Sequence, residues 1–294
     1  MKGLVCAVTG ASGYLGSSLA SYLEENEISV VRMSRPTAGK AGEKSLSFIL
    51  GESPTPGMFR ERNVTALVHC AYDFSLTTRR DIQKVNVDGS LRLIDAALNE
   101  GVQKVVFISS ISAFEGCRSL YGQAKLAVEK RILELKGHVV RPGLIYSTPI
   151  KSANGGMFGR ICHSILQSRL IPVIGSASSV QYLVHVEDLC RVVLALMIPE
   201  SAAPASPIVV ASDRLIGFHE LLELIASSAK RSVRFVHIPW RAAWLGLVLA
   251  ERLGIHTGFR SDSVIAFIYQ DPHPDLSSVQ SMGLTLRDFR ESLC

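Results

Sequence analysis

The sequence contains no run of five or more like charges and no apolar segment of the ~20 residues that a membrane-spanning helix needs. A nucleic-acid-binding arm and a membrane span are therefore not expected. The formal net charge of +5 is spread along the chain and suits an anionic small molecule. The most apolar window, residues 242–250, lies between Arg241 and Glu251. Its length favours a buried helix, and a helix at a membrane surface is the alternative.

Closely spaced cysteines are also lacking. The six cysteines lie far apart, without a Cys-x-x-Cys pair and without the His and Cys spacing of a zinc site. We predict reduced thiols, no metal site and a cytoplasmic location. The apolar stretch after Lys2, residues 4–8, is too short for a signal peptide and leads directly into a turn.

Short β-branched runs alternate with helical patterns in the first half of the chain, as in a parallel sheet that is covered by helices. The order predicts an α/β protein with a doubly wound parallel sheet. The expected strands are residues 4–9, 29–33, 46–50, 66–70, 104–109 and 138–141, and the expected helices are residues 15–25, 80–100 and 121–135.

The pattern changes after residue 143, where helices separated by Gly, Pro and Ser clusters predominate. We expect a dinucleotide-binding domain over residues 1–146, with residues 184–212 returning to it, and a smaller, mainly helical substrate-binding lobe over residues 147–294. Strand-like stretches at 181–186 and 207–211 are candidates to rejoin the sheet. Further helices are expected near residues 218–229, 240–253 and 284–293.

A glycine-rich turn follows the first expected strand and opens the first expected helix. A tight turn, a close approach of backbone to a pyrophosphate and close helix-strand packing each require a missing side chain. The first turn of the helix then offers free N–H groups and a positive dipole end to phosphates. The turn therefore predicts a dinucleotide site formed by Gly10, Ser12, Gly13, Tyr14, Leu15 and Gly16.

The end of the second expected strand distinguishes the two nicotinamide cofactors. An acidic residue there would bind the ribose 2′-hydroxyl and repel a 2′-phosphate. This chain instead has Arg32, Ser34 and Arg35. Ser34 and Arg35, with Arg32 as a further candidate, can hold a phosphate. We predict NADP as the cofactor, and NAD stays possible.

A serine, a tyrosine and a lysine form the candidate catalytic set. Tyr121 and Lys125 are separated by one helical turn and share a helix face. A nearby ammonium lowers the pKa of a phenol and allows proton exchange near neutral pH. Ser110 ends the fifth expected strand, the edge at which such sheets present ligands, and can hydrogen-bond a substrate oxygen.

These motifs resemble those of the extended branch of the short-chain dehydrogenase/reductase superfamily, the NAD(P)-dependent sugar epimerase/dehydratase family. The resemblance covers nearly the whole chain and implies a Rossmann-type sheet. The matching segments run in order through residues 9–16, 68–71, 86–90, 109–110, 121–125, 141–146 and 184–189.

The resemblance implies hydride transfer between a nicotinamide and a carbon that bears oxygen. Tyr121 would be the general acid and base, Lys125 would lower its pKa and hold the nicotinamide ribose, and Ser110 would orient the carbonyl. Asn86 would support the site through its backbone or a water. Ala71, Gly143 and Ile145 join Tyr121 and Lys125 as implied cofactor contacts, and His185 and Asp188 are interpreted as residues that join the two lobes.

The resemblance leaves several reactions open. Residues 154–175 resemble a nucleotide-sugar segment, with Asn154 and Arg160 as substrate-binding candidates, although a lobe-packing helix fits equally well. Ile111 follows Ser110 where family dehydratases carry an acid, which disfavours dehydration.

We expect reduction of a keto group on a nucleotide-linked sugar. The alternatives are a nucleotide-sugar epimerase, a reductase of a lipid or steroid-like ketone, and a non-catalytic NADP-binding regulator. By resemblance, we expect a homodimer formed through helices 80–100 and 121–135.

Overall fold

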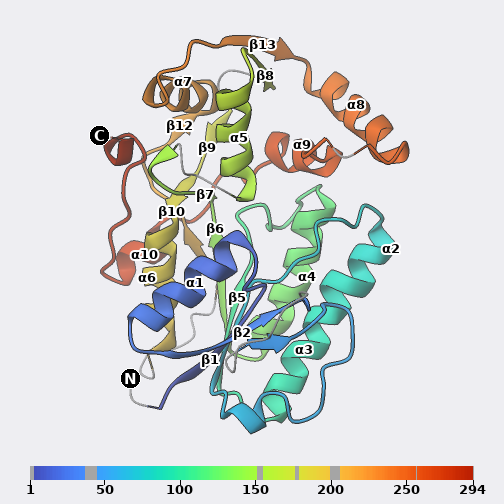
Figure 1. Ribbon diagram of the computed structural model, residues 1–294, viewed down its shortest axis with the longest axis vertical. Helices are drawn as coiled ribbons and strands as arrows, with labels where there is room; N and C mark the ends of the chain where they lie inside the picture. The colour runs from blue at the N-terminus through green and yellow to red at the C-terminus, as the bar shows by residue number, and fades with distance from the viewer. Residues whose placement is uncertain are drawn as a thin grey trace.

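A seven-stranded sheet forms the lower half of the molecule (Figure 1). The computed structural model describes residues 3–36, 45–150, 155–175, 179–198, 206–255 and 257–293. Every neighbouring pair of strands in the sheet is parallel, which confirms the predicted doubly wound sheet. The strand order is β11-β6-β5-β4-β1-β2-β3, with β1 Val5–Thr9, β2 Ser29–Ser34, β3 Ser45–Ser47, β4 Ala66–His69, β5 Lys104–Ile108, β6 His138–Pro142 and β11 Ile208–Val210.

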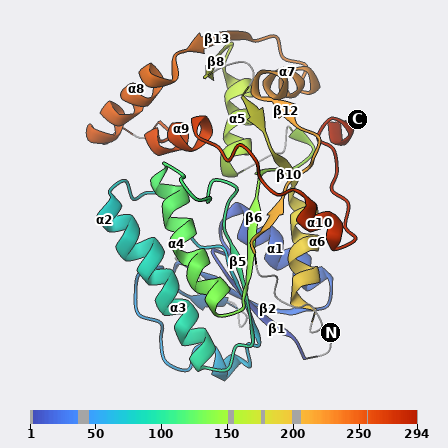
Figure 2. The same ribbon diagram turned by 180° about the vertical axis from the view of Figure 1, so that it is seen from behind.

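Helices cover both faces of this sheet, as a parallel sheet requires. Helices α1 (Tyr14–Glu25) and α6 (Val186–Met197) pack against one face, and their Leu, Val and Ala side chains form one buried cluster with β1, β4 and β5. Helices α2 (Arg79–Ile82), α3 (Asp88–Asn99) and α4 (Leu120–Glu134) lie on the opposite face (Figure 2). A second buried cluster fills the space beneath α3 and α4.

The expected helix 80–100 is divided by a π-helical turn over Gln83–Val87. This turn begins where α2 ends and leads directly into α3, so the segment stays helical throughout. Gly89, at the start of α3, lies so close to the backbone that a Cβ atom there would be 2.7 Å from the nitrogen of Gly51. The helix therefore packs tightly on the loop that follows β3.

The second half forms an upper lobe with its own buried cluster. Three two-stranded sheets pair β7 (Leu144–Tyr146) with β10 (Leu183–His185), β9 (Val180–Gln181) with β12 (Ile216–Gly217), and β8 (Leu170–Ile174) with β13 (Arg234–Ile238). The helices are α5 (Gly156–Gln167), α7 (Phe218–Ser228), α8 (Trp240–Arg252), α9 (Ser261–Ile268) and α10 (Ser277–Ser281).

Three expectations about this half need correction. The stretch 181–186 does not rejoin the main sheet, because β10 pairs with β7, whereas 207–211 does return as β11. Helix α8, expected to be buried, has no buried residue. Helix α10 packs against β11, with Val279 in the buried cluster of the sheet, although its residues were assigned to the lobe.

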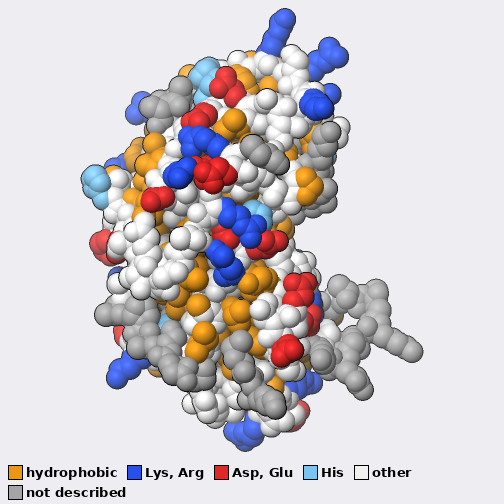
Figure 3. All heavy atoms as spheres, turned by 90° about the vertical axis from the view of Figure 1, so that its left-hand side faces the viewer, with side chains coloured by type: hydrophobic (Ala, Val, Ile, Leu, Met, Phe, Trp, Pro, Cys, Tyr) orange, Lys and Arg blue, Asp and Glu red, His pale blue; other side chains and the backbone are white. Residues whose placement is uncertain are grey.

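The expected helix 284–293 is also wrong, since only a 3-10 turn at Glu291–Leu293 forms there. Tertiary ion pairs hold the segment instead: Arg287 contacts Glu187 at 2.6 Å, and Arg290 contacts Glu220 at 2.8 Å. Acidic and basic side chains gather at mid-height on the face that Figure 3 shows. The segment thus crosses from the sheet domain to the lobe as an irregular strap.

Candidate active site

The glycine turn between β1 and α1 is too tight for side chains. A Cβ atom on Gly16 would lie 2.2 Å from the carbonyl oxygen of Gly10. Gly10 has a φ of +67° and packs against Ala71, where a Cβ atom would lie 3.1 Å from the Ala71 Cα. The turn therefore holds the start of α1 directly above the ends of β1 and β4.

The N-terminus of α1 is suited to an anion. Its N-cap, Gly13, provides no side-chain cap, and the first turn carries no acidic residue. Such an end presents backbone N–H groups and the positive end of the helix dipole. Ser12 and Gly13 are exposed, so a pyrophosphate can approach. The residues present therefore fit a dinucleotide.

A buried polar chain fixes the ends of β1 and β4 beneath this turn. The hydroxyl oxygen of Thr9 accepts hydrogen bonds from the backbone nitrogens of Cys70 and Ala71, at 3.0 and 3.1 Å. Its proton is therefore donated to Nδ1 of His69, 2.7 Å away. Nε2 of His69 then donates to Ser90 Oγ at 2.8 Å, and Ser90 donates to the carbonyl oxygen of Asn86. Burial lowers the pKa of His69 to about 3, so the ring is neutral.

Asn86 supports the loop that follows β4. Its Oδ1 accepts from the nitrogen of Asp73 at 2.7 Å, and its Nδ2 donates to the carbonyl oxygen of Asp73 at 3.1 Å. The side chain of Asn86 thus holds the loop, while its backbone carbonyl ends the polar chain from Thr9. The resemblance implied backbone or water-mediated support, and the side-chain clamp adds to it.

The end of β2 presents one exposed arginine. Arg35 is exposed, and within the described part of the chain it forms no ion pair. Arg32 is instead held by Glu24 at 2.7 Å and by Ser21 at 3.1 Å. Of the two arginines, Arg35 is therefore the one without an ion pair among the described residues, and it follows Ser34, which ends β2.

The structure brings the three candidate catalytic residues together. Ser110, just after β5, lies beside the hydroxyl of Tyr121 in the first turn of α4, close enough to lower the pKa of the phenol. Ser110 Oγ accepts from the backbone nitrogen of Ser112 at 3.1 Å. This bond holds the serine hydroxyl beside the tyrosine before any ligand binds.

Aromatic side chains surround Tyr121. The ring of Tyr72 meets it edge-on with 5.0 Å between centroids, and Phe74 lies 5.7 Å away. Burial raises the pKa of Tyr121 to about 12, and the neighbouring Ser110 hydroxyl offsets this only in part. The sequence predicted a lowered pKa through Lys125, whereas in this arrangement burial dominates. Tyr121 is a protonated phenol at neutral pH.

Lys125 lies under the same aromatic group. Its Nζ donates to the carbonyl oxygen of Ile108 at 2.8 Å and lies 5.9 Å from the ring centroid of Tyr121. The rings of Phe107 and Tyr72 flank the ammonium at 4.7 and 5.3 Å. Burial lowers the pKa of Lys125 to about 8. The lysine therefore carries its charge at neutral pH and loses it in mild alkali.

An ion pair behind Lys125 fixes the strand ends. Glu129, one turn further along α4, is 1% exposed and binds Arg141 of β6 through both carboxylate oxygens, at 2.5 and 2.9 Å. Ser109 also donates to Glu129. Because Ser109 precedes Ser110, this network fixes the backbone of the candidate catalytic serine.

A carboxylate from the upper lobe caps the catalytic helix. Asp262 of α9 accepts hydrogen bonds from the backbone nitrogens of Leu120 and Tyr121, at 2.7 and 2.9 Å. Nearby, Arg260 donates to the carbonyl oxygen of Phe74 at 2.8 Å. Sequence analysis missed Asp262, because no local pattern links it to a helix that begins over 140 residues earlier.

The remaining site candidates lie around the junction of the two lobes. A Cβ atom on Gly143 would lie 2.2 Å from the carbonyl oxygen of Tyr182, so only glycine fits there. Ile145 lies on β7 and packs on the sheet cluster. Arg160 is exposed on α5. Asn154 lies outside the described residues.

His185 and Asp188 hold the segment that joins the two lobes. Nδ1 of His185 accepts from the backbone nitrogen of Glu187, and the guanidinium of Arg287 lies 3.1 Å from it. Asp188 is buried and accepts from the backbone nitrogen of Arg287 at 2.8 Å. Both residues thus anchor the C-terminal strap, as expected for residues that join the two lobes.

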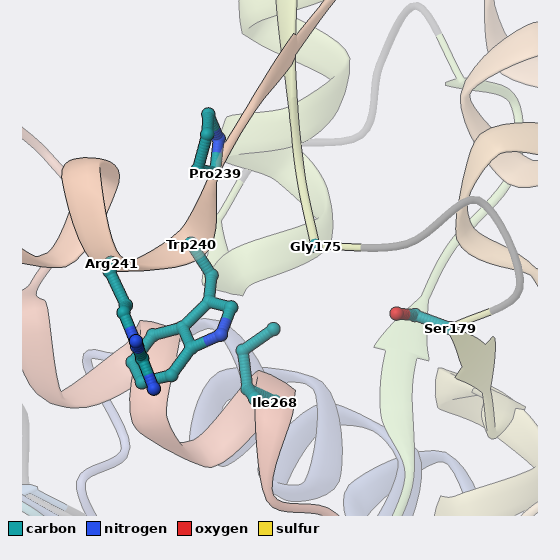
Figure 4. A pocket seen from close by; sticks show the side chains of 6 residues that line it. All are labelled: Gly175, Ser179, Pro239, Trp240, Arg241 and Ile268. Atoms are coloured by element: carbon teal, nitrogen blue, oxygen red, sulfur yellow. The ribbon is translucent and has the colours of Figure 1, made fainter.

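An open hollow of about 530 Å³ lies in the upper lobe, away from the candidate catalytic residues (Figure 4). The indole of Trp240 contacts Tyr269, and the guanidinium of Arg118 lies 4.1 Å from the Tyr269 ring centroid. Arg118 precedes α4, so these contacts link the segment beside the hollow to the segment before that helix. Its lining residues are Gly175, Ser179, Pro239, Trp240, Arg241 and Ile268.

The described ranges contain no group of three or more His, Cys, Asp or Glu side chains that could hold a metal ion. No helix within them is long and apolar enough to cross a membrane.

The curated relatives are 22–27% identical to this chain over the aligned residues. A ceramide reductase of Caulobacter vibrioides is 27% identical over 190 residues, which are 63% of this chain and 58% of the relative. A UDP-glucose 4-epimerase of Vibrio cholerae is 25% identical over 49% of this chain and 53% of its own. The uncharacterized protein y4nG of Sinorhizobium fredii is 24% identical over 84% and 66%. The chain thus spans about half to two thirds of the length of these relatives.

Solved structures share the fold. MoeE5 in complex with UDP-glucose and NAD has a TM-score of 0.72 at 18% identity, over 99% of this chain and 96% of that one. A UDP-glucose 4-epimerase with UDP-glucose from Thermotoga maritima has a TM-score of 0.66 at 21% identity, over 80% and 86%. The sequence pattern of the NAD dependent epimerase/dehydratase family matches residues 6–212. The chain therefore belongs to that family, as its motifs predicted.

Proposed function

We propose that this protein is an NADP-dependent reductase of a keto group. The observation that carries the proposal is the position of Ser110 beside the hydroxyl of Tyr121, with the pKa of Tyr121 raised to about 12 by burial. Reduction of a carbonyl needs a proton donor, and a phenol that is protonated at neutral pH is that donor. Oxidation would need the phenolate, which burial disfavours here.

The bound dinucleotide would supply the hydride. Tyr121 donates its proton to the carbonyl oxygen, and Ser110 hydrogen-bonds the same oxygen. The charge of Lys125, held beside the tyrosine, favours the phenolate that remains. The aromatic rings of Tyr72 and Phe74 exclude water around the phenol. The arginine at the end of β2, Arg35, supports NADP as the cofactor.

We take a nucleotide-linked keto sugar as the first candidate substrate. Arg160 is exposed on α5, where a diphosphate could reach its guanidinium, and several structural neighbours bind UDP-sugars. An apolar ketone is the second candidate. The hollow beside Trp240 and the aromatic cover of Tyr121 favour it, and a ceramide reductase is among the relatives. Epimerisation, by oxidation and re-reduction, uses the same residues.

Turnover of NADPH with a panel of substrates tests the proposal. We expect oxidation of NADPH with either a nucleotide-linked 4-keto sugar or a long-chain ketone, and the responsive class identifies the substrate. Tyr121→Phe should lower kcat at least ~100-fold and leave NADPH affinity nearly unchanged, because it removes only the proton donor. Tyr22→Phe, a half-buried tyrosine of α1, is the matched control.

Two outcomes would reject this assignment. One is a Tyr121→Phe variant that reduces a substrate as fast as the unmodified protein. The other is interconversion of UDP-sugars without net NADPH oxidation, which would identify an epimerase.

A further inference from the structure

Helix α8 exposes a continuous apolar surface. None of its residues is buried. Leu245, Leu249 and Leu253, four residues apart, are 61%, 57% and 66% exposed and form one stripe. Trp244 and, after the helix, Ile255 and Phe259 are also exposed. Six of the fourteen exposed large hydrophobic side chains in the described part of the chain therefore lie within residues 244–259. Such concentration marks an interaction surface.

Both tryptophans of the chain lie on this helix. Trp240 faces inward, where its ring meets Tyr269 edge-on, while Trp244 is 37% exposed. An exposed indole is most stable where its ring contacts an apolar phase and its N–H contacts water, as at the headgroup level of a bilayer.

Basic side chains lie at both ends of α8 and in the segment that precedes it. Arg241 and Arg252 lie in the first and last turns of α8, and Lys230, Arg231 and Arg234 lie in the segment that leads to it. All five are exposed, and none forms an ion pair with a carboxylate among the residues described.

The acidic residue of α8 already accepts hydrogen bonds within the protein. Glu251 accepts hydrogen bonds from the backbone nitrogen and the hydroxyl of Ser261, at 2.8 and 2.7 Å. A second copy of this chain would bring like charges together across a two-fold interface, with no free carboxylate on the helix to compensate. Anionic headgroups would instead pair with the arginines while the leucines enter the acyl region.

We propose that α8, from Trp240 to Arg252, together with Leu253, Ile255 and Phe259, is a docking surface for an anionic lipid membrane. The helix lies in the plane of the membrane and does not cross it, consistent with its 13 residues. In Figure 1, α8 projects from the side of the upper lobe, so the sheet domain stays clear of the bilayer. This proposal goes beyond the proposed function and does not depend on it.

Binding of the full chain to vesicles tests the proposal. Flotation should recover the protein with phosphatidylcholine vesicles that contain about 30% phosphatidylglycerol, and much less with pure phosphatidylcholine. Tryptophan emission should shift to the blue on binding and be quenched by brominated acyl chains. Because both tryptophans lie on α8, this signal reports on that helix alone.

Variants locate the surface. Leu245→Glu with Leu249→Glu should weaken binding at least ~10-fold, and Arg241→Gln with Arg252→Gln should do so for anionic vesicles only. Leu215→Glu, 43% exposed on a different part of the lobe, is the matched control and should bind normally. If the leucine variant fails to fold, quenching of Trp244 in the unmodified protein still decides the question.

Three results would overturn the proposal. They are absence of flotation at low salt with both vesicle types, binding that the leucine variant retains, and a dimer that Leu245→Glu dissociates in a protein that ignores vesicles. The last would show that a second copy covers α8.

Discussion

At the scale of single residues, the candidate site depends on which side chains already form ion pairs or hydrogen bonds within the protein. Arg32 is held by Glu24, while its neighbour Arg35 is exposed at the end of β2. Ser110 is held beside Tyr121 by the backbone nitrogen of Ser112, which donates to its hydroxyl oxygen. One arginine and one hydroxyl thus carry much of the proposed chemistry.

Cofactor preference provides a prediction at this scale. Arg35→Asp should weaken NADPH binding about 10- to 100-fold, because a charged hydrogen bond to the 2′-phosphate is lost and a repulsive charge replaces it. NADH binding should change little. Titration of both cofactors, followed by fluorescence, measures the difference. Arg231→Asp, at the far end of the lobe, removes the same charge and controls for general electrostatics. Equal affinities for the two cofactors in the unmodified protein would contradict the NADP assignment.

At the scale of elements, buried polar chains lock strand ends to helices. The chain from Thr9 through His69 to Ser90 joins β1, β4 and α3. Glu129 of α4 joins β5 and β6 through Ser109 and Arg141. Each chain lies just beneath the edge at which ligands bind, so it sets the geometry of the candidate site.

The His69 chain predicts a pH dependence of stability. Its pKa is about 3 in the folded protein and 6.5 as a free side chain, so the unfolded chain takes up the proton first. The stabilisation is complete above pH ~6.5 and declines as pH falls toward 3. From pH 7.5 to 5, His69 alone should lower the unfolding free energy by about 2 kcal/mol.

Denaturant unfolding at several pH values measures this slope. His69→Gln keeps hydrogen-bonding groups but cannot titrate, so its slope should be shallower. Burial also lowers the pKa of His138 and His185, and these residues act equally in both proteins. The difference between the two slopes therefore isolates His69, and identical slopes would contradict a neutral, buried ring.

At the scale of the whole molecule, the upper lobe completes the catalytic helix. Asp262 caps α4 from α9, and Arg260 holds the loop that carries Phe74. A carboxylate at the N-terminus of α4 satisfies two backbone donors and interacts favourably with the helix dipole. Movement of the lobe would therefore change the position of Tyr121.

Removal of this cap should affect catalysis more than cofactor binding. Asp262→Ala should lower stability by about 1 kcal/mol, as loss of an N-terminal cap does, and should lower kcat about tenfold because Tyr121 loses its fixed position. NADPH affinity should stay within about twofold. Thermal unfolding and steady-state kinetics measure the two effects.

Asp275→Ala is the control for this experiment, because Asp275 makes equivalent local hydrogen bonds to Ser277 but does not touch α4. An Asp262→Ala variant with unchanged kcat would show that the contact between the lobes is structural only.

The sequence by itself determined the sheet, the glycine turn and the set of Ser110, Tyr121 and Lys125. Each of these depends on local chemistry: β-branched runs form buried strands, glycines permit close backbone contact, and a four-residue spacing places two side chains on one helix face. These signals lie within short segments, so they can be recognised in the sequence alone.

Only the tertiary structure decided the rest, because it depends on contacts between distant segments. It brought Asp262 of α9 to the N-terminus of α4. It also holds residues 284–290 as an irregular strap through ion pairs, where a helix was expected. It also left α8 at the surface, although its composition suggested burial. The raised pKa of Tyr121 also depends on tertiary contacts. The rings of Tyr72 and Phe74 that surround the phenol follow the end of β4, and the burial that raises the pKa comes from such distant segments.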